Sequence, residues 1–322
     1  MLTKLKKKVL AGEKITKEEA IKLVELEESR TMELLAAANQ IKNQFIGKKV
    51  DLCSIVNAKS GSCSEDCTFC AQSIHYDTGV SSYDLLDRKD ILARAKEIGD
   101  SGAEHFGIVT SGRGVVSDQE FEQILETMKT IKEETELEVC ASLGTLDQKR
   151  VEKLSGIGLK RYNHNLETSK SHFPEVCTTH SYEDRVKTVR FLKDRDIEVC
   201  CGGIIGLGED FADRVELAFT LRELDVDSVP INILNPVAGT PVEDNESVPP
   251  REVLKTAAIF RFTLPNKVIK LCGGREDNLR DLQSLSLLSG INGLLTGNYL
   301  TTEGRAVEED IQMIHDLGLT EE

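Results

Sequence analysis

Three cysteines, Cys63, Cys67 and Cys70, lie within eight residues of a polar, glycine-bearing loop at the spacing C-x3-C-x2-C. Three thiolates this close together can hold three irons of a [4Fe–4S] cube, whereas a closed ferredoxin-type site needs a fourth thiolate that this stretch does not supply. One iron is then left open to bind a small molecule. The spacing therefore predicts chemistry at a cluster and not simple electron storage.

A structural zinc site is the alternative interpretation of the same cysteines. Such sites usually combine a C-x2-C pair with a second Cys or His pair of similar spacing. The sequence contains no such second pair to accompany Cys67 and Cys70. An iron–sulfur cluster is therefore favoured over zinc.

The overall composition indicates an acidic, soluble enzyme. The chain has 322 residues, 39% of them hydrophobic, and a formal net charge of −15, which argues against a nucleic-acid or anionic-membrane surface. No apolar run of signal-peptide or bilayer-spanning length occurs, so we expect a cytoplasmic protein. Nine cysteines are an odd number for a disulfide framework and, in a reducing compartment, are better interpreted as thiols or metal ligands.

The rest of the chain alternates short β-branched segments with amphipathic helices, after a helical region at 3–47. Within that region Thr16 and Glu19 resemble a capping box before the helical segment that begins at Ala20. Eight strand–helix units predict a closed (β/α)8 TIM-type barrel at 49–322, preceded by an N-terminal helical cap at 1–48. The expected strands are 50–56, 104–110, 137–143, 161–166, 198–205, 228–234, 267–271 and 292–296. The expected helices are 89–98, 117–134, 146–154, 182–194, 211–224, 250–262, 278–288 and 307–317.

A second set of cysteines falls on the odd-numbered strands of this barrel: Cys53, Cys140, Cys200 and Cys272. Layers inside such barrels draw their side chains from alternate strands, so these thiols are expected to converge. They are either inert buried thiols, since free cysteine is often buried, or ligands of a second iron–sulfur cluster. The catalytic groups of such a barrel lie at the C-terminal ends of the strands, where the Cys63 loop begins.

The cysteine motif also resembles a known signature. C-x3-C-x-aromatic-C, with Phe69 as the aromatic residue, is similar to the motif of radical S-adenosylmethionine (SAM) enzymes. The flanking Ser60-Gly-Ser-Cys-Ser-Glu-Asp-Cys67 and Ala71-Gln-Ser73 resemble the biotin synthase family specifically. The resemblance implies that the open iron binds SAM, that one electron splits it to a 5′-deoxyadenosyl radical, and that sulfur is inserted into dethiobiotin to form biotin.

In that family an auxiliary cluster deep in the barrel donates the sulfur, and the resemblance carries over in part. Cys140 and Cys200 match ligand positions of the family. Gly107 stands where the family has a cysteine, and Lys270 stands where it has an arginine ligand. Cys272 offers a replacement thiolate, as does Cys53. We therefore expect an auxiliary cluster that is [4Fe–4S]-like, with an open or sulfide-bearing iron, in preference to [2Fe–2S].

Polar groups at other strand ends resemble cofactor and substrate sites of the family. Asn165 and Glu167 fall on one strand face and are expected to bind the ribose or methionyl group of SAM. The alternative is that their side chains only form hydrogen bonds that finish the end of the strand. His164, which directly precedes Asn165, is expected to be a packed, satisfied histidine and not a ligand. The remaining expected SAM contacts are Phe69, Gly203, Gly206 and Gly208.

The expected substrate contacts are Asn163, the ureido-binding Asn232, and three residues that would meet the substrate carboxylate, namely Lys59, Thr301 and Thr302. Asn232 can instead be a turn-forming residue. Cys177 and Cys201 are expected to be structural.

Three functions remain to be separated. The favoured one is a biotin synthase that uses dethiobiotin, SAM and a flavodoxin- or ferredoxin-type reductant, with a homodimer implied by the family. A rival is a related radical SAM enzyme acting on a small amino acid, such as a methylornithine-type mutase or a hydrogenase-cofactor maturase. An iron–sulfur carrier is the alternative from another class.

Overall fold

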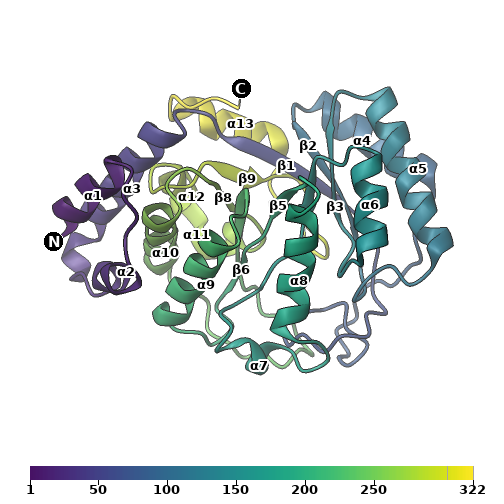
Figure 1. Cartoon of the computed structure of the whole chain (residues 1–322), viewed down its shortest axis with the longest axis horizontal. Helices are drawn as coiled ribbons and strands as arrows, with labels where there is room; N and C mark the ends of the chain where they lie inside the picture. Colours follow the sequence, from purple (N-terminus) through teal and green to yellow (C-terminus); the bar gives the residue numbers. More distant parts are fainter. Residues whose placement is uncertain (303, 322) are drawn as a thin grey trace.

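The computed structural model describes residues 1–302 and 304–321 and shows parallel strands curled into a barrel that helices surround (Figure 1). The hydrogen-bonded order is β5-β4-β3-β2-β1-β9-β8-β7-β6, and an additional β5–β7 pairing closes the ring. The predicted TIM-type barrel is therefore confirmed. The strands are β1 (Asp51–Lys59), β2 (His105–Thr110), β3 (Glu138–Ser142), β4 (Arg161–Asn163), β5 (Glu198–Cys200), β6 (Gly203–Ile205), β7 (Ser228–Ile233), β8 (Val268–Leu271) and β9 (Gly293–Leu295).

One predicted strand, 198–205, is split in two. β5 ends at Cys200 and β6 begins at Gly203, because the chain bends at Cys201 and Gly202. A Cβ on Gly202 would lie 1.9 Å from the carbonyl oxygen of Pro230, so the backbones of the bend and of β7 approach more closely than any side chain allows. The two halves together occupy one position in the eight-stranded barrel.

Four of the barrel helices begin at side-chain caps. Ser117, Asp147, Ser181 and Asp210 each accept a hydrogen bond from a backbone N–H in the first turn that follows. The helices are α4 (Arg88–Asp100), α5 (Asp118–Glu134), α6 (Gln148–Gly156), α7 (Phe173–Val176), α8 (Tyr182–Lys193), α9 (Phe211–Glu223), α10 (Pro250–Thr263), α11 (Arg275–Leu279), α12 (Gln283–Leu287) and α13 (Val307–Asp316).

The predicted helix 278–288 is broken into α11, a 3-10 turn at Arg280–Leu282 and α12. Arg280 has a φ of 50°, in the left-handed region where an α-helix cannot continue.

The N-terminal helices are α1 (Leu2–Leu10), α2 (Lys17–Val24) and α3 (Thr31–Phe45), at the purple end of the chain in Figure 1. α2 lies against α9 and α10, α3 lies against α10, and α1 packs on α3. The predicted capping box of Thr16 and Glu19 starts α2. Lys42 of α3 is buried and donates from Nζ to the carbonyl oxygen of Leu287 at 2.8 Å. Burial lowers the Lys42 pKa to about 8. Among the helices in residues 1–302 and 304–321, none is long and apolar enough to cross a membrane.

Candidate active site

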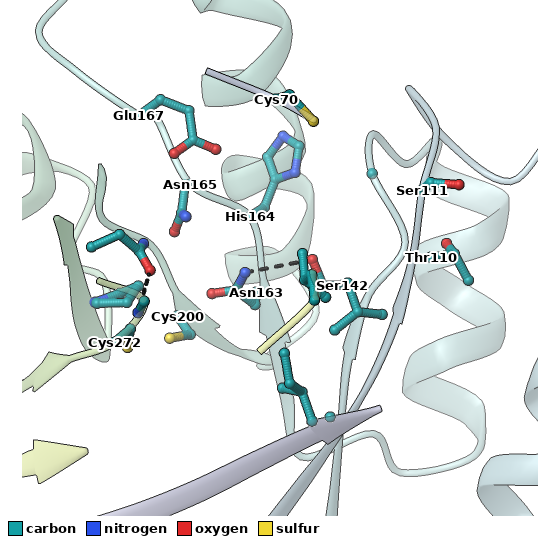
Figure 2. Close-up of a pocket in the computed structure, with 18 of the residues that line it drawn as sticks. Cys70, Thr110, Ser111, Ser142, Asn163, His164, Asn165, Glu167, Cys200 and Cys272 are labelled. Atoms are coloured by element: carbon teal, nitrogen blue, oxygen red, sulfur yellow. Dashed lines mark hydrogen bonds between the residues drawn. The ribbon is translucent and has the colours of Figure 1, made fainter. Parts of the chain in front are cut away.

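Both sets of cysteines line one cavity of about 430 Å³ that runs from the cluster loop into the barrel. In Figure 2, Cys200 and Cys272 lie on one side of the pocket, while Cys70 and Glu167 lie together at another. The seven cysteines that line the cavity are Cys53, Cys63, Cys67, Cys70, Cys140, Cys200 and Cys272.

The cluster loop is folded back on itself. Gly61 and Ser62 adopt left-handed φ angles of 73° and 53°, and the side-chain oxygen of Gln72 accepts from the Ser60 hydroxyl and the Gly61 N–H, both at 3.1 Å. The Cys63 N–H donates to the backbone oxygen of Gln72 at 3.0 Å. These bonds turn the three predicted ligands toward the same cavity.

The chemistry of this donor set fits a metal cluster. Burial raises the pKa of Cys70 to about 11 and also raises the pKa of Cys63, so these thiols remain protonated at neutral pH unless a metal displaces the protons. Phe69, which comes from the same loop, lines the cavity as well.

The segment 177–180, which follows α7, is clamped onto the cluster loop by the two acids between Cys63 and Cys67. Asp66 accepts hydrogen bonds from the backbone N–H groups of Thr178 at 2.9 Å and Thr179 at 3.1 Å. Glu65 accepts from the Thr179 hydroxyl at 2.8 Å and from His180 Nδ1 at 2.6 Å. The cluster loop is therefore held from outside the motif.

Cys177 belongs to this clamp, although sequence reasoning expected only a structural role for it. Ligand atoms of Cys67, Cys177 and His180 all lie within 4.8 Å of one another. Arg185 Nε donates to His180 Nε2 at 3.0 Å, so Nδ1 carries the proton of a neutral ring and donates toward Glu65. His180 thus has no lone pair to offer a metal, and the trio is a hydrogen-bonded group.

A hydrogen bond from Cys67 lowers the pKa of Cys177 to about 4, against the opposing effect of burial and with a further contribution from His180. No local signal in the sequence links Cys177 to Cys67, because the two residues meet only through the folded chain.

The inner thiols come together as the strand pattern predicts. Cys53, Cys140, Cys200 and Cys272 all line the cavity. Burial raises the pKa of Cys272, and the neighbouring Cys53 and Cys200 raise it further. Among the residues that the structure describes, no three of these thiols lie within single-ion distance of one another. Cys201, in contrast, is buried and is not among the cavity-lining residues.

A buried ionic group lies beside the inner thiols. Asp51 accepts a hydrogen bond from Lys270 and lies 3.3 Å from both Arg161 Nη1 and His105 Nε2. Burial lowers the pKa of Lys270, but Cys53 and Asp51 raise it more, so the ammonium stays charged. A charged ammonium has no lone pair, so in this arrangement Lys270 offers none to iron.

Asn165 and Glu167 both line the cavity, as their shared strand face predicts. Arg185 Nη1 donates to Glu167 Oε1 at 3.4 Å, and Asn165 Oδ1 accepts from the Gly202 N–H at 3.2 Å. Burial raises the pKa of Glu167, and Arg185 partly offsets this effect. Glu167 Oε2 is buried without a hydrogen-bond partner in the described structure, so it is available to a ligand hydroxyl.

The three predicted glycines do not line the cavity. Gly203 packs behind it, where an added Cβ would lie 2.2 Å from the carbonyl oxygen of Glu167. Gly206 and Gly208 adopt φ angles of 101° and 99° at the following turn. The absence of a side chain at Gly203 lets β6 approach the Glu167 backbone.

The predicted substrate residues are divided between the cavity and its surroundings. Asn163 and Asn232 line the cavity, and the Asn232 amide bridges neighbouring strand ends by accepting from the Gly273 N–H at 3.1 Å. Thr301 lines the cavity, whereas Thr302 is exposed and does not. Lys59 is paired with Glu120.

His164 is buried, and burial holds its pKa well below the usual value. It is packed, as the sequence predicts, but it also lines the cavity, and its Nε2 has no hydrogen-bond partner among the described residues.

Comparison with known proteins agrees with this geometry. Residues 59–221 match the Radical SAM superfamily, and residues 230–320 match the Biotin and Thiamin Synthesis associated domain. The chain is 54% identical over 320 residues to biotin synthase of Pelotomaculum thermopropionicum, covering 99% of each protein. It is 50% identical to biotin synthase of Carboxydothermus hydrogenoformans, covering 98% of this chain and 97% of that protein. The chain belongs to the biotin synthase family.

Solved structures show how widely this fold is shared beyond the biotin synthase family. Methylornithine synthase superposes with a TM-score of 0.85 at 22% identity, covering 98% of this chain and 96% of the other. A maturase of the [FeFe]-hydrogenase superposes with a TM-score of 0.84 at 16% identity, covering 99% and 74%. At these identities the likeness concerns the fold alone.

Proposed function

We propose that the chain catalyses the SAM-dependent insertion of sulfur into dethiobiotin to form biotin. The observation that carries this proposal is a single cavity lined by two separate sets of cysteines, one on the cluster loop and one inside the barrel. Membership of the biotin synthase family supports the same function.

In this proposal Cys63, Cys67 and Cys70 hold a [4Fe–4S] cluster, which when bound supplies the electron for reductive cleavage of SAM. Glu167 and Asn165 bind the polar groups of SAM from the end of β4. Arg185 positions Glu167 through its 3.4 Å contact, while burial keeps water away from the unpartnered Glu167 oxygen.

The auxiliary site is proposed to use Cys140, Cys200 and Cys272, with Cys53 as a further ligand, and to supply the inserted sulfur. A [4Fe–4S]-like cluster with an open or sulfide-bearing iron suits these ligands better than [2Fe–2S]. Lys270 and Arg161 place positive charge beside these thiols, which favours an anionic group there. Mössbauer spectra with iron and sulfide analysis test this assignment, and an auxiliary signal of purely [2Fe–2S] type would contradict it.

The barrel wall itself positions the substrate. Asn163 and Asn232 offer amide donors and acceptors to the ureido ring from β4 and β7. Holding one C–H bond beside the cleaved cofactor in a water-poor cavity is the main contribution that a barrel can make to radical chemistry.

The deciding experiment incubates reduced, reconstituted protein with SAM and dethiobiotin without oxygen. We expect both biotin and 5′-deoxyadenosine. Deoxyadenosine without biotin would favour a radical SAM enzyme that acts on a small amino acid, and the absence of both would favour an iron–sulfur carrier. The inner thiols favour the formation of both biotin and 5′-deoxyadenosine, because neither rival function needs these thiols.

Three further assignments complete the proposal: a flavodoxin- or ferredoxin-type reductant, a homodimer, and a cytoplasmic location. We also propose that residues 1–48 form a cap distinct from the barrel at 49–322. Sedimentation of the purified protein tests the dimer, and reduction kinetics with each electron carrier test the reductant.

A further inference from the structure

Four cationic side chains line the cavity in the described part of the chain, and three of them are committed to buried partners. Arg161 and Lys270 both face Asp51. Arg185 donates to Glu167, to the backbone oxygen of Asn165 at 2.9 Å and to His180. The fourth is Arg113, in the loop after β2.

Arg113 differs from the other three in exposure and pairing. Its side chain is 48% exposed, and its one acidic partner among residues 1–302 and 304–321 is Asp184, 42% exposed, at 3.5 Å from Nη2. The Asp184 carboxylate already accepts the Ser181 N–H at 3.1 Å at the start of α8. An exposed pair of this kind contributes little, so most of the five guanidinium donors remain open to a ligand.

The backbone of Arg113 is nevertheless held firmly. Its carbonyl oxygen accepts from the Thr145 N–H at 2.6 Å and from the Thr145 hydroxyl at 2.9 Å. Gly114 and Gly144 form a bridge between the two loops. A Cβ on Gly144 would lie 2.3 Å from the Arg113 oxygen, so only glycine permits this contact. A fixed backbone at the rim of the cavity suits a residue that anchors a ligand.

Lys59, the cation expected to bind the substrate carboxylate, forms an ion pair with Glu120. Its Nζ lies 2.7 Å from Glu120 Oε1, and it lines a neighbouring cavity but not the one that holds the cysteines, whereas Arg113 lines both. Dethiobiotin carries its reacting carbons at the ureido end and a carboxylate at the other. With the ureido end at the inner thiols, the carboxylate reaches toward the partly exposed rim.

We propose that Arg113 binds the carboxylate of dethiobiotin and so determines the preference for an acidic substrate. This inference rests on the proposed function. A guanidinium binds a carboxylate through two parallel N–H donors, which fixes the end of the substrate chain as well as its charge. Thr301, which lines the same cavity, offers a hydroxyl to that carboxylate.

The test compares equilibrium binding of dethiobiotin and its neutral primary carboxamide to reconstituted, SAM-loaded protein. Wild-type protein should prefer the carboxylate by about tenfold or more, the effect of a hydrogen-bonded charge pair. Arg113→Ala should bind both ligands equally, and Arg113→Lys should retain part of the preference. Arg94→Ala, which removes the same charge from an exposed position on α4, is the matched control and should behave as wild type.

Each result has a defined meaning. Full carboxylate preference in Arg113→Ala overturns the inference, and loss of that preference in Lys59→Ala reassigns the contact to Lys59. If Arg113→Ala weakens SAM and leaves dethiobiotin unchanged, the guanidinium addresses SAM and the inference is also wrong. Failure of wild-type protein to bind dethiobiotin at all contradicts the proposed function itself. Unchanged iron content and circular dichroism show that the variants are folded.

Discussion

Replacing Asp51 by Asn removes one charge from the buried ionic group without changing its shape. The Lys270 side chain is only 1% exposed, and Asp51 is its one acidic partner in the described chain. Arg161 keeps a second partner, Glu198, at 3.1 Å. Leaving one buried charge unpaired costs about 3–5 kcal/mol, so we expect Asp51→Asn to lower the free energy of unfolding by roughly that amount.

The pH dependence has a definite sign. Burial raises the pKa of Asp51, but Lys270, His105 and Arg161 together lower it further below its ordinary value of 3.8. A carboxylate whose folded pKa is depressed stabilises the protein above its unfolded pKa. The contribution of Asp51 is therefore complete at neutral pH and is lost as the pH falls below about 3.8.

Urea unfolding of the cluster-free protein, followed by circular dichroism, measures the effect. The control is Glu183→Gln, which breaks an exposed pair with Lys170 whose side chains are 65% and 58% exposed, and should cost less than about 1 kcal/mol. The double variant Asp51→Asn/Lys270→Met should recover much of the loss, because no unpaired ammonium remains. An effect no larger than that of the control, or a double variant no better than the single one, would refute the reasoning.

Three shorter predictions concern the site. Cys67→Ala should lose cluster iron, whereas Cys201→Ala should retain it; equal iron contents would contradict the ligand assignment. In cluster-free protein, the ultraviolet absorbance of the Cys177 thiolate should titrate near pH 4, because Cys67 and His180 stabilise this thiolate. The same titration should be missing from Cys177→Ala. A midpoint near an ordinary thiol pKa would argue against this stabilisation. Gly203→Ala should weaken SAM binding, since its Cβ would meet a backbone oxygen at 2.2 Å, while Gly156→Ala, with open space, should not.

Much of this protein follows from patterns that are local in the chain. Cys63, Cys67 and Cys70 lie within one short loop, so their spacing alone predicts a shared metal site. The alternation of strands and helices predicts the barrel, and the barrel in turn brings Cys140, Cys200 and Cys272 to one cavity. Strand periodicity also places Asn165 and Glu167 on one face.

Other features were decided only by tertiary contacts between distant segments. The sequence does not show that Cys177 lies beside Cys67, that Lys59 forms an ion pair with Glu120, or that Arg113 lies at the rim of the cavity. Periodicity determines which way a side chain points from its own element. Which partner it finds depends on how loops cross the barrel mouth, and many loop paths satisfy the same pattern of apolar residues.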